Sequence, residues 1–216
     1  DVEEVCRRLD PLVSRDNIWG ARGGVLLAAT DPDVLEELAL GDASRGFDFE
    51  VQRENGSRRK VTLMPGGPEA LARQRIGQGA GVAPPLQYRE KSRLLWMQPL
   101  DSALYVRMDG VADTHEESFA HFVERIFTTA EETGARTLLL DLRDNPGGQG
   151  HLARPLLHRL IASDTFNHPG GLYVLTGRRT FSAAMALAAQ IELHTAARFV
   201  GEPTGSRPNF VGETTL

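Results

Sequence analysis

The sequence predicts an α/β fold in which a mostly parallel sheet fills the second half of the chain. Segments 137–142 and 171–176 are continuous apolar runs typical of strands buried on both faces, and segment 198–201 begins a third such strand. Helical patterns lie between them, over residues 151–163 and over the alanine-rich stretch 182–197. Because strands that alternate with helices connect through right-handed crossovers, these segments predict neighbouring parallel strands covered by helices.

The residues ahead of this pattern are expected to add two strands and one helix to the same core. Strand character covers residues 94–97 and 103–108, with a turn at Asp101-Ser102 between them. Residues 118–133 predict an amphipathic helix, since their apolar side chains recur at helical spacing. Gly134 is expected to end this helix.

The first 64 residues predict a smaller unit of helices and a β-hairpin. Residues 2–13 have apolar side chains at helical spacing, and a second helix is expected over residues 31–41, capped by its aspartate and ended by its glycine. Residues 47–52 alternate apolar and polar side chains, which predicts a half-buried strand, and residues 60–64 form the returning strand. Asn55-Gly56 between them is a strong hairpin signal.

These patterns divide the chain into three parts. Residues 1–66 form the small unit, residues 67–93 a link rich in glycine and proline, and residues 94–216 the core. The chain opens without a methionine, and its last residues resemble the start of a strand. We therefore expect an internal segment of a longer protein, with a core that is incomplete at its C-terminus.

The composition argues against several classes of protein. With 41% hydrophobic and 25% charged residues, the chain has enough apolar side chains for a sizeable core. No apolar run approaches the ~18–20 residues of a membrane span. A net charge of −5 without a basic block argues against nucleic acid as a partner. The single cysteine, Cys6, excludes an internal disulfide, and the six histidines show no metal-ligand spacing, so no metal is expected.

Loop 141–148 directly follows a predicted buried strand, a position at which open α/β sheets bind ligands. Gly147 and Gly148 let the backbone approach a ligand and turn its N–H groups toward an anion or a developing oxyanion. The alternative is a tight turn that needs positive φ, in which Arg143 is only an ion-pair partner of Asp141 or Asp144. The pattern by itself leaves both interpretations open.

Loop 177–185 follows the next predicted strand and contains Ser182 at the expected start of a helix. The partial positive charge of a helix N-terminus favours a hydroxyl there, and the N–H of Ala183 is free to bind an oxyanion. The alternative is that Ser182 is an ordinary N-cap residue. The loop is not a Gly-x-Ser-x-Gly turn, which argues against the α/β-hydrolase fold.

Together the loops belong to a longer pattern: L-L-L-D-L-R-D-N-P-G-G, then Y-V-L-T-G-R-R-T-F-S-A-A, then V-G-E-P-T-G. In order and spacing, from about Trp96 to Leu216, this pattern resembles the C-terminal processing (tail-specific) serine peptidases. The resemblance implies a crotonase/Clp-protease-like α/β core that acts on peptide or protein substrates without a cofactor. It also implies that the small N-terminal unit is part of a degenerate PDZ-like module.

The resemblance assigns roles to four residues. It implies that Ser182 is the nucleophile that forms the acyl-enzyme, and that the oxyanion hole combines the N–H of Ala183 with that of Gly147 or Gly148. His151 lies three residues after Gly148. It is the histidine nearest to the expected oxyanion loop and a candidate for substrate contact.

One departure from the family pattern concerns the general base. Where the tail-specific branch has a lysine in G-E-x-T-x-G-K-G, this chain has Arg207, which stays protonated and cannot accept the serine proton. Lys60 and Lys91 are the only lysines of the chain, and neither lies at that position. The departure favours the tricorn-like branch of the family, with a histidine base from outside this segment. Arg207 and Asn209 are then candidates for substrate binding.

Two other functions stay open at this level. A non-catalytic binder of a small ligand or peptide would use the same fold without a base. A dinucleotide-binding domain is the remote alternative, because residues 148–153 have the pattern G-x-G-x-x-A. Against it, polar residues separate the strand from the glycines, which in such domains begin the turn.

Overall fold

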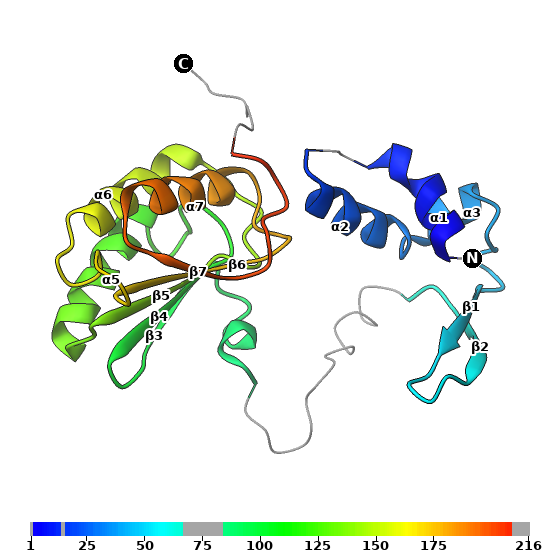
Figure 1. Cartoon of the computed structure of the whole chain (residues 1–216), viewed down its shortest axis with the longest axis horizontal. Coiled ribbons are helices and arrows are strands. Elements are labelled where there is room, and N and C mark those ends of the chain that lie inside the picture. Colours follow the sequence, from blue (N-terminus) through cyan, green and yellow to red (C-terminus); the bar gives the residue numbers. More distant parts are fainter. Residues whose placement is uncertain (1, 14–15, 67–83, 209–216) are drawn as a thin grey trace. The chain divides into compact units, whose positions relative to one another are not determined.

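The computed structural model describes residues 2–13, 16–66 and 84–208 (Figure 1). The chain forms two compact units. One comprises residues 1–14 and 24–84, and the other comprises residues 15–23 and 85–216.

The N-terminal helices are α1 (Val2–Leu9), the 3₁₀ turn η1 (Asp10–Leu12), α2 (Ile18–Ala28) and α3 (Pro32–Glu37). The predicted cap of α3 is confirmed, because the side chain of Asp31 accepts the N–H of Asp33 at 3.0 Å. The predicted end at Gly41 is wrong: the helix ends at Glu37, and Ala39 already has a left-handed φ of +53°. Helix α2 was not predicted, since its three glycines lower helix propensity.

The hairpin pairs β1 (Phe47–Gln52) with β2 (Arg58–Leu63) in antiparallel register. Its turn follows the Asn-Gly prediction: Gly56 has a φ of +80°, and the N–H of Arg53 donates to the carbonyl of Ser57 at 2.9 Å. The predicted half-buried face is wrong. Of its apolar side chains only Phe47 is buried, whereas Phe49, which lines an open groove, is 37% exposed.

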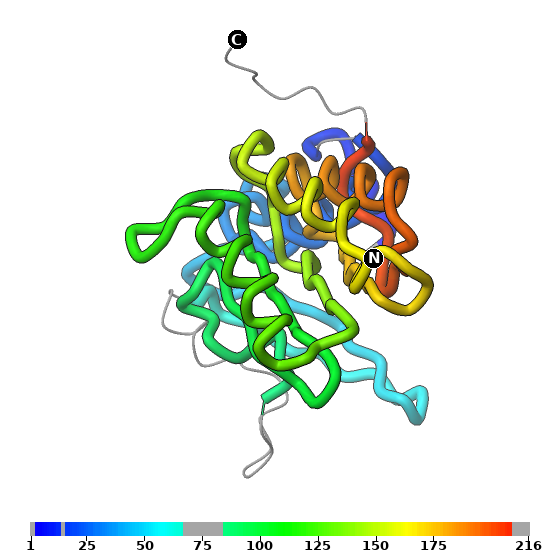
Figure 2. The backbone as a smooth tube through the Cα atoms, turned by 90° about the vertical axis from the view of Figure 1, so that its left-hand side faces the viewer, coloured from blue at the N-terminus to red at the C-terminus, as the bar shows by residue number. Residues whose placement is uncertain are grey.

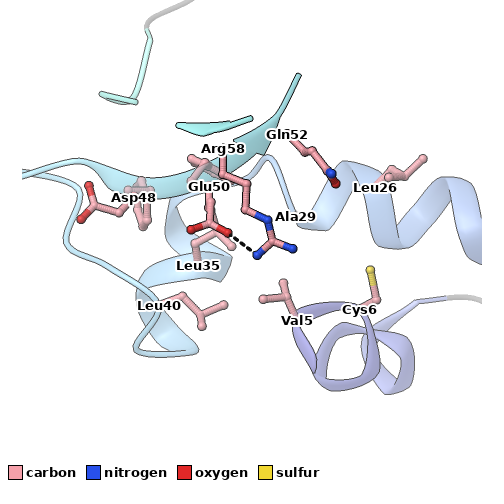
Figure 3. A pocket seen from close by; sticks show the side chains of 12 residues that line it. Val5, Cys6, Leu26, Ala29, Leu35, Leu40, Asp48, Glu50, Gln52 and Arg58 are labelled. Atoms are coloured by element: carbon pink, nitrogen blue, oxygen red, sulfur yellow. Dashed lines mark hydrogen bonds and ion pairs between the residues drawn. The ribbon is translucent and has the colours of Figure 1, made fainter. Parts of the chain in front are cut away.

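An open groove of about 740 Å³ lies within this unit, between the hairpin and the helices (Figure 3). Its walls are mainly apolar, from α1 and α3 among others, and the ion pair of Glu50 with Arg58 at 3.0 Å crosses its edge. Cys6 lies on the α1 side of the groove, partly buried and unpaired.

The second unit contains the sheet. Strand β3 (Leu95–Pro99) runs antiparallel to β4 (Ala103–Met108), and β4, β5 (Thr137–Asp141), β6 (Leu172–Thr176) and β7 (Arg198–Gly201) are parallel, in the order β3-β4-β5-β6-β7. The predicted mostly parallel sheet is therefore confirmed. Each crossover moves to the next strand in the same direction, so the connecting helices lie on one face of the sheet (Figure 1).

These helices are α5 (Phe119–Thr133), the 3₁₀ turn η3 (Gly150–Ala153) with α6 (Arg154–Ile161), and α7 (Ser182–His194). They lie side by side in chain order (Figure 2). Both predicted ends of α5 are confirmed, because Ser118 accepts the N–H of His121 at 3.2 Å and Gly134 has a φ of +69°. The predicted helix over 151–163 opens as a 3₁₀ turn, and the helix predicted to reach residue 197 ends at His194.

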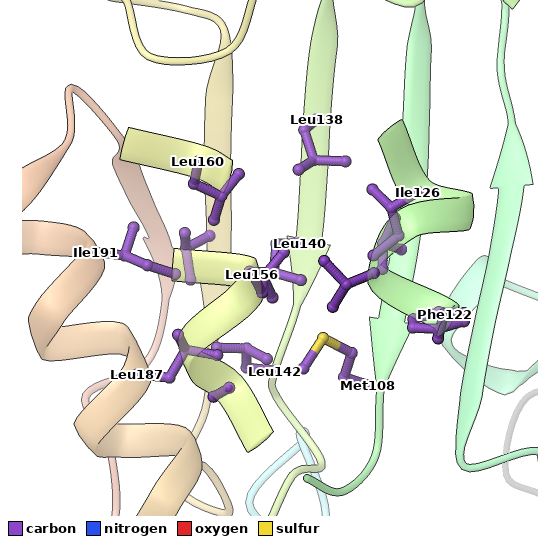
Figure 4. Packing of buried hydrophobic residues seen from close by; sticks show 14 of the residues in the cluster. Met108, Phe122, Ile126, Leu138, Leu140, Leu142, Leu156, Leu160, Leu187 and Ile191 are labelled. Carbon is purple, nitrogen blue, oxygen red and sulfur yellow. The ribbon is translucent and has the colours of Figure 1, made fainter. Parts of the chain in front are cut away.

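The hydrophobic core lies between this face of the sheet and the three helices (Figure 4). Strands β4 and β5, together with Leu142 directly after β5, supply a row of apolar side chains, and the three helices pack over this row. The fully or nearly fully buried members include Met108, Leu138, Leu140, Leu142, Phe122, Ile126, Leu156, Leu160, Leu187 and Ile191. A dense core of this kind fixes the strand ends, and with them the loops that follow.

Candidate active site

The loops after β4 and β5 meet at the carboxyl edge of the sheet. The N–H of Val111 donates to the carbonyl of Gly147 at 2.8 Å, and the carbonyl of Val111 accepts the N–H of Gln149 at 2.7 Å. These bonds make a parallel bridge in which Val111 is paired with Gly148. The N–H of Gly148 is thus turned away from Val111, since in such a bridge only the flanking residues bond to the partner.

The loop after β6 is joined to the same assembly through Thr180, which is fully buried. The Thr180 hydroxyl donates to the carbonyl of Leu142 at 2.7 Å and accepts the N–H of Gly177 at 2.9 Å. The carbonyl of Thr180 accepts the N–H of Gly205, beyond β7, at 3.0 Å. Through its side chain and its main-chain carbonyl, this one buried residue therefore connects the loops after β5, β6 and β7.

Asn145 determines which glycine N–H is available. This residue is fully buried, and its Oδ1 accepts the N–H of Gly147 at 2.8 Å. Its carbonyl accepts the N–H of Phe181 at 3.0 Å. Of the two adjacent glycines, Gly148 is thus the one whose N–H has no acceptor among the described residues.

Gly147 lies directly against the residue singled out as the nucleophile. It has a φ of +112°, and a methyl group in place of its hydrogen would lie 2.7 Å from Cβ of Ser182 and 2.9 Å from the nitrogen of Ala183. Both the backbone conformation and the close approach require glycine. The fold therefore brings together two loops that are about three dozen residues apart in the chain.

Ser182 has a left-handed φ of +48°, which is uncommon for a residue other than glycine. It is the first residue of α7, and the N-cap is Phe181, so the interpretation of Ser182 as the N-cap is wrong. Its N–H donates to Oγ of Ser206 at 3.1 Å. The residue is partly exposed, and its hydroxyl makes no hydrogen bond within the described part of the chain.

Ala183 and Gly148 both present N–H groups without an acceptor in the described ranges. Ala183 is in the first turn of α7, where N–H groups lack helical partners and the helix dipole favours negative charge. An oxyanion formed at Ser182 would therefore find a donor in the adjacent residue.

An ion pair of a buried aspartate with a partly exposed arginine lies at the start of the β5 loop. Asp141 is 2% exposed, and Arg143 binds both of its oxygens, with Nη2 to Oδ2 at 2.6 Å and Nε to Oδ1 at 2.9 Å. The hydroxyl of Tyr105 donates to Oδ2 at 2.5 Å. Burial raises the pKa of Asp141, but the hydrogen bonds from Arg143 and Tyr105 outweigh it and leave this pKa below its usual value. Burial and the contact with Asp141 raise the pKa of Tyr105.

A second charged group ties the segment ahead of the sheet to the same loop. Nζ of Lys91 lies 2.9 Å from Oδ2 of Asp144 and 3.4 Å from Oδ2 of Asp109. Burial raises the pKa of Asp109 above its usual value, although Arg107 and Lys91 oppose this rise. Arg107, 1% exposed, also donates to the main-chain carbonyls of residues 87, 89, 90 and 93, around η2 (Leu86–Tyr88).

The remaining predicted residues are less closely connected to Ser182. His151 is exposed in η3, and neither a hydrogen bond nor an ion pair joins its imidazole to another described residue. Arg207 is exposed, and its guanidinium has no partner among the described residues. Asn209 lies outside the described residues. Arg143 pairs with Asp141, one of the two partners that the structural interpretation expected.

Sequence reasoning assigned no role to Asn145, Thr180 or Ser206. Asn145 has a recognisable signal, because asparagine often bonds to the main chain two residues on and here precedes Pro-Gly-Gly. Thr180 and Ser206 have no comparable local pattern, because the Thr180 hydroxyl donates to Leu142 and the Ser206 hydroxyl accepts the N–H of Ser182, each in another loop.

Within residues 2–13, 16–66 and 84–208, no cluster of three or more histidine, cysteine or acidic side chains could hold a metal ion. Among the described helices, none is both long enough and apolar enough to span a membrane.

No family model matches the sequence, and no curated protein matches it. Solved structures are similar over part of the chain. A photosystem II D1 C-terminal processing protease is 21% identical, with a TM-score of 0.40, over 50% of this chain and 33% of its own. A candidate S41 protease from Bacteroides fragilis is 17% identical, with a TM-score of 0.41, over 74% of this chain and 47% of its own. A candidate peptidase from Parabacteroides merdae is 15% identical, with a TM-score of 0.44, over 95% of this chain and 68% of its own.

The similar structures thus include members of the S41 protease family, at low identity and low TM-score. The chain spans about a third of the length of the first and about half of the second.

Proposed function

We propose that this chain carries the nucleophile and the oxyanion hole of a serine peptidase of the C-terminal processing type. The observation that carries the proposal is the contact of Gly147 with Ser182 and the nitrogen of Ala183. It supports a site in which the loop of the two glycines, the hydroxyl and the helix N-terminus act on one carbonyl group.

The proposed reaction proceeds through an acyl-enzyme. Oγ of Ser182 attacks the carbonyl carbon of a peptide bond while a base takes its proton, and the carbonyl oxygen becomes an oxyanion. The N–H groups of Ala183 and Gly148 bind that oxyanion, a contribution of about 3–4 kcal/mol per donor in other enzymes. The amine leaves with a proton, and water then hydrolyses the ester and restores Ser182.

The general base is proposed to be a histidine outside residues 1–216, as in the tricorn-like branch. A serine hydroxyl is a weak nucleophile until a base accepts its proton, and Arg207 cannot do so. On this proposal, changing Arg207 to alanine in the intact protein leaves most of the peptidase rate. His151 is the alternative base within the chain.

The domain division belongs to the same proposal. Residues 94–216 would form the peptidase core, residues 67–93 a link, and residues 1–66 part of a PDZ-like module. Peptides or proteins would be the substrates.

Labelling of the intact protein with a fluorophosphonate probe tests the proposal, because only an activated serine reacts. We expect mass spectrometry to find the adduct on Ser182, with labelling lost in Ser182→Ala. The control Ser102→Ala, which removes an exposed hydroxyl in the β3–β4 turn, should label as the wild type does. Absence of labelling would refute the peptidase and favour the non-catalytic binder, whereas labelling that persists in Ser182→Ala would refute Ser182 as the nucleophile.

A further inference from the structure

An open groove of about 320 Å³ begins beside the proposed oxyanion hole. It is lined by η3 and α6 on one side and by α7 on the other. Helices α6 and α7 lie next to each other in Figure 4. Its lining residues are Gly150, Ala153, Arg154, Leu157, His158, Ala183, Ala186, Leu187 and Gln190.

The groove and the proposed reaction share Ala183. A methyl group at Gly150 would lie 3.6 Å from Cβ of Ala183, so η3 comes within contact distance of the first turn of α7. When the oxygen of a substrate carbonyl binds the N–H of Ala183, the substrate residue that contributes this carbonyl lies next to the Ala183 side chain. The nearest substrate side chain to the groove is then that of the residue that owns the scissile carbonyl.

The floor of the groove is apolar, and its rim is basic. Ala153 and Leu187 are each 4% exposed and form part of the floor, while the exposed side chains of Arg154 and His158 lie one helical turn apart on the rim. No carboxylate is among the lining residues, and Arg154 has no ion-pair partner in the part of the chain that the structure describes. The next arginine of α6, Arg159, is by contrast bound to Glu124 at 2.7 Å.

We propose that this groove is the specificity pocket of the peptidase and selects an acidic side chain, glutamate or aspartate, in the residue that contributes the scissile carbonyl. The inference rests on the proposed function. The methylene groups of the substrate lie on the apolar floor, and its carboxylate meets the guanidinium of Arg154, with His158 as a second polar partner.

Equilibrium binding of product-type peptides to Ser182→Ala protein tests this inference without requiring turnover. The peptides are fluorescently labelled and identical except for a last residue of Glu, Gln, Leu, Lys or Gly. Their C-terminal carboxylate is common to all, so differences between them report the side chain. We expect Glu to bind about three- to tenfold more tightly than Gln, as for a partly exposed charge pair, and Lys to bind more weakly than Gln.

Variants on the rim identify the residue responsible. Arg154→Ala should bind the Glu and Gln peptides with equal affinity. Arg154→Glu should bind the Lys peptide more tightly than the Glu peptide. Arg136→Ala, which removes an exposed charge just before β5, at the opposite edge of the sheet from the site, should keep the wild-type order. Ala186→Leu places a larger side chain at an exposed position of α7. It should weaken the binding of the Glu and Gln peptides and leave the binding of the Gly peptide unchanged.

Equal affinities for Glu, Gln and Lys would overturn the inference, as would a preference for Glu that survives Arg154→Ala. Probe labelling of Ser182 separates this failure from that of the proposed function. If Ser182 is labelled and the peptides bind without preference, only the specificity is wrong. If Ser182 is not labelled, the peptidase itself is wrong.

Discussion

Ser182 combines three properties that are seldom found together in one residue. It has a left-handed backbone, a hydroxyl without a hydrogen bond among the described residues, and a neighbour whose main chain leaves no room for a side chain. A non-glycine residue in such a conformation costs of the order of 1–3 kcal/mol and persists only where its surroundings impose it. Here one such contact is the hydrogen bond from the Ser182 N–H to Ser206, whose side chain is 1% exposed.

Ser206 is therefore predicted to position the nucleophile. In Ser206→Ala the N–H of Ser182 loses its acceptor, so we expect the free energy of unfolding to fall by about 1–2 kcal/mol and probe labelling to slow about tenfold or more. Chemical denaturation and the labelling rate measure the two effects. Thr137→Val is the matched control, since it removes a hydrogen bond of 3.3 Å to the carbonyl of Gly170 at the other edge of the sheet. An equal loss of labelling in both variants would mean that Ser206 acts only through stability.

At the scale of elements, the site is made by loops that follow consecutive parallel strands. The bridge of Val111 with Gly148 extends the pairing of β4 and β5 beyond their ends, so the glycine loop continues the sheet. Thr180 and Asn145 then connect this loop to the one that precedes α7. Loops held in this way are expected to keep two N–H groups in place before a substrate arrives, as oxyanion stabilisation requires.

Gly147→Ala is predicted to disrupt this junction. The added methyl group would meet Cβ of Ser182 at 2.7 Å, so the loops must separate, and we expect labelling to fall by about two orders of magnitude, as for loss of one oxyanion donor. Gly134→Ala is the control for the effect of backbone strain alone. Gly134 also has positive φ, but a methyl group added there would have no atom within 4 Å. We expect the control to lose about 1 kcal/mol of stability and keep its labelling rate. Unchanged labelling in Gly147→Ala would contradict the proposed site.

At the scale of the whole molecule, the order of the strands explains where the site lies. Because β4 to β7 follow one another without a reversal, the helices share one face and the carboxyl ends of all four strands share one edge. Among the described strands the order does not reverse, and a reversal is where the crevice that binds dinucleotides forms. Gly150 begins only the 3₁₀ turn η3, and the α-helix α6 starts at Arg154, so neither Gly148 nor Gly150 lies at the start of an α-helix as that function requires.

The stability of the fold is predicted to fall in acid through Asp141. Since its pKa is lower in the folded state than the usual 3.8, the unfolded chain binds more protons, and this stabilisation is lost as the pH falls from about 5 through the folded-state pKa. Denaturant unfolding between pH 6 and 3 should show a shallower decline in Asp141→Asn than in the wild type, from a lower starting stability. Asp101→Asn, which removes an exposed carboxylate in the β3–β4 turn, should keep the wild-type slope. Equal slopes for Asp141→Asn and the wild type would show that the buried pair does not govern this dependence.

Much of this architecture follows from local patterns. The apolar run of β5 predicts a buried parallel strand because such a strand needs apolar side chains on both faces. Ser118 and Gly134 mark the ends of α5 because capping and left-handed termination depend on the residue itself. Helix α2 escaped prediction because contacts elsewhere in the fold outweigh the cost of its glycines, and a local pattern does not contain those contacts.

The sequence by itself determined the order of strands and helices, the glycine pair and a serine at the start of a helix, since each depends on residues close together in the chain. Only the tertiary structure decided that Gly147 touches Ser182, that Asn145 occupies the N–H of Gly147, and that Ser206 holds the main chain of the serine. The reason is physical. These contacts join residues from separate loops, and their geometry is set by the packing of strands and helices that no single segment encodes.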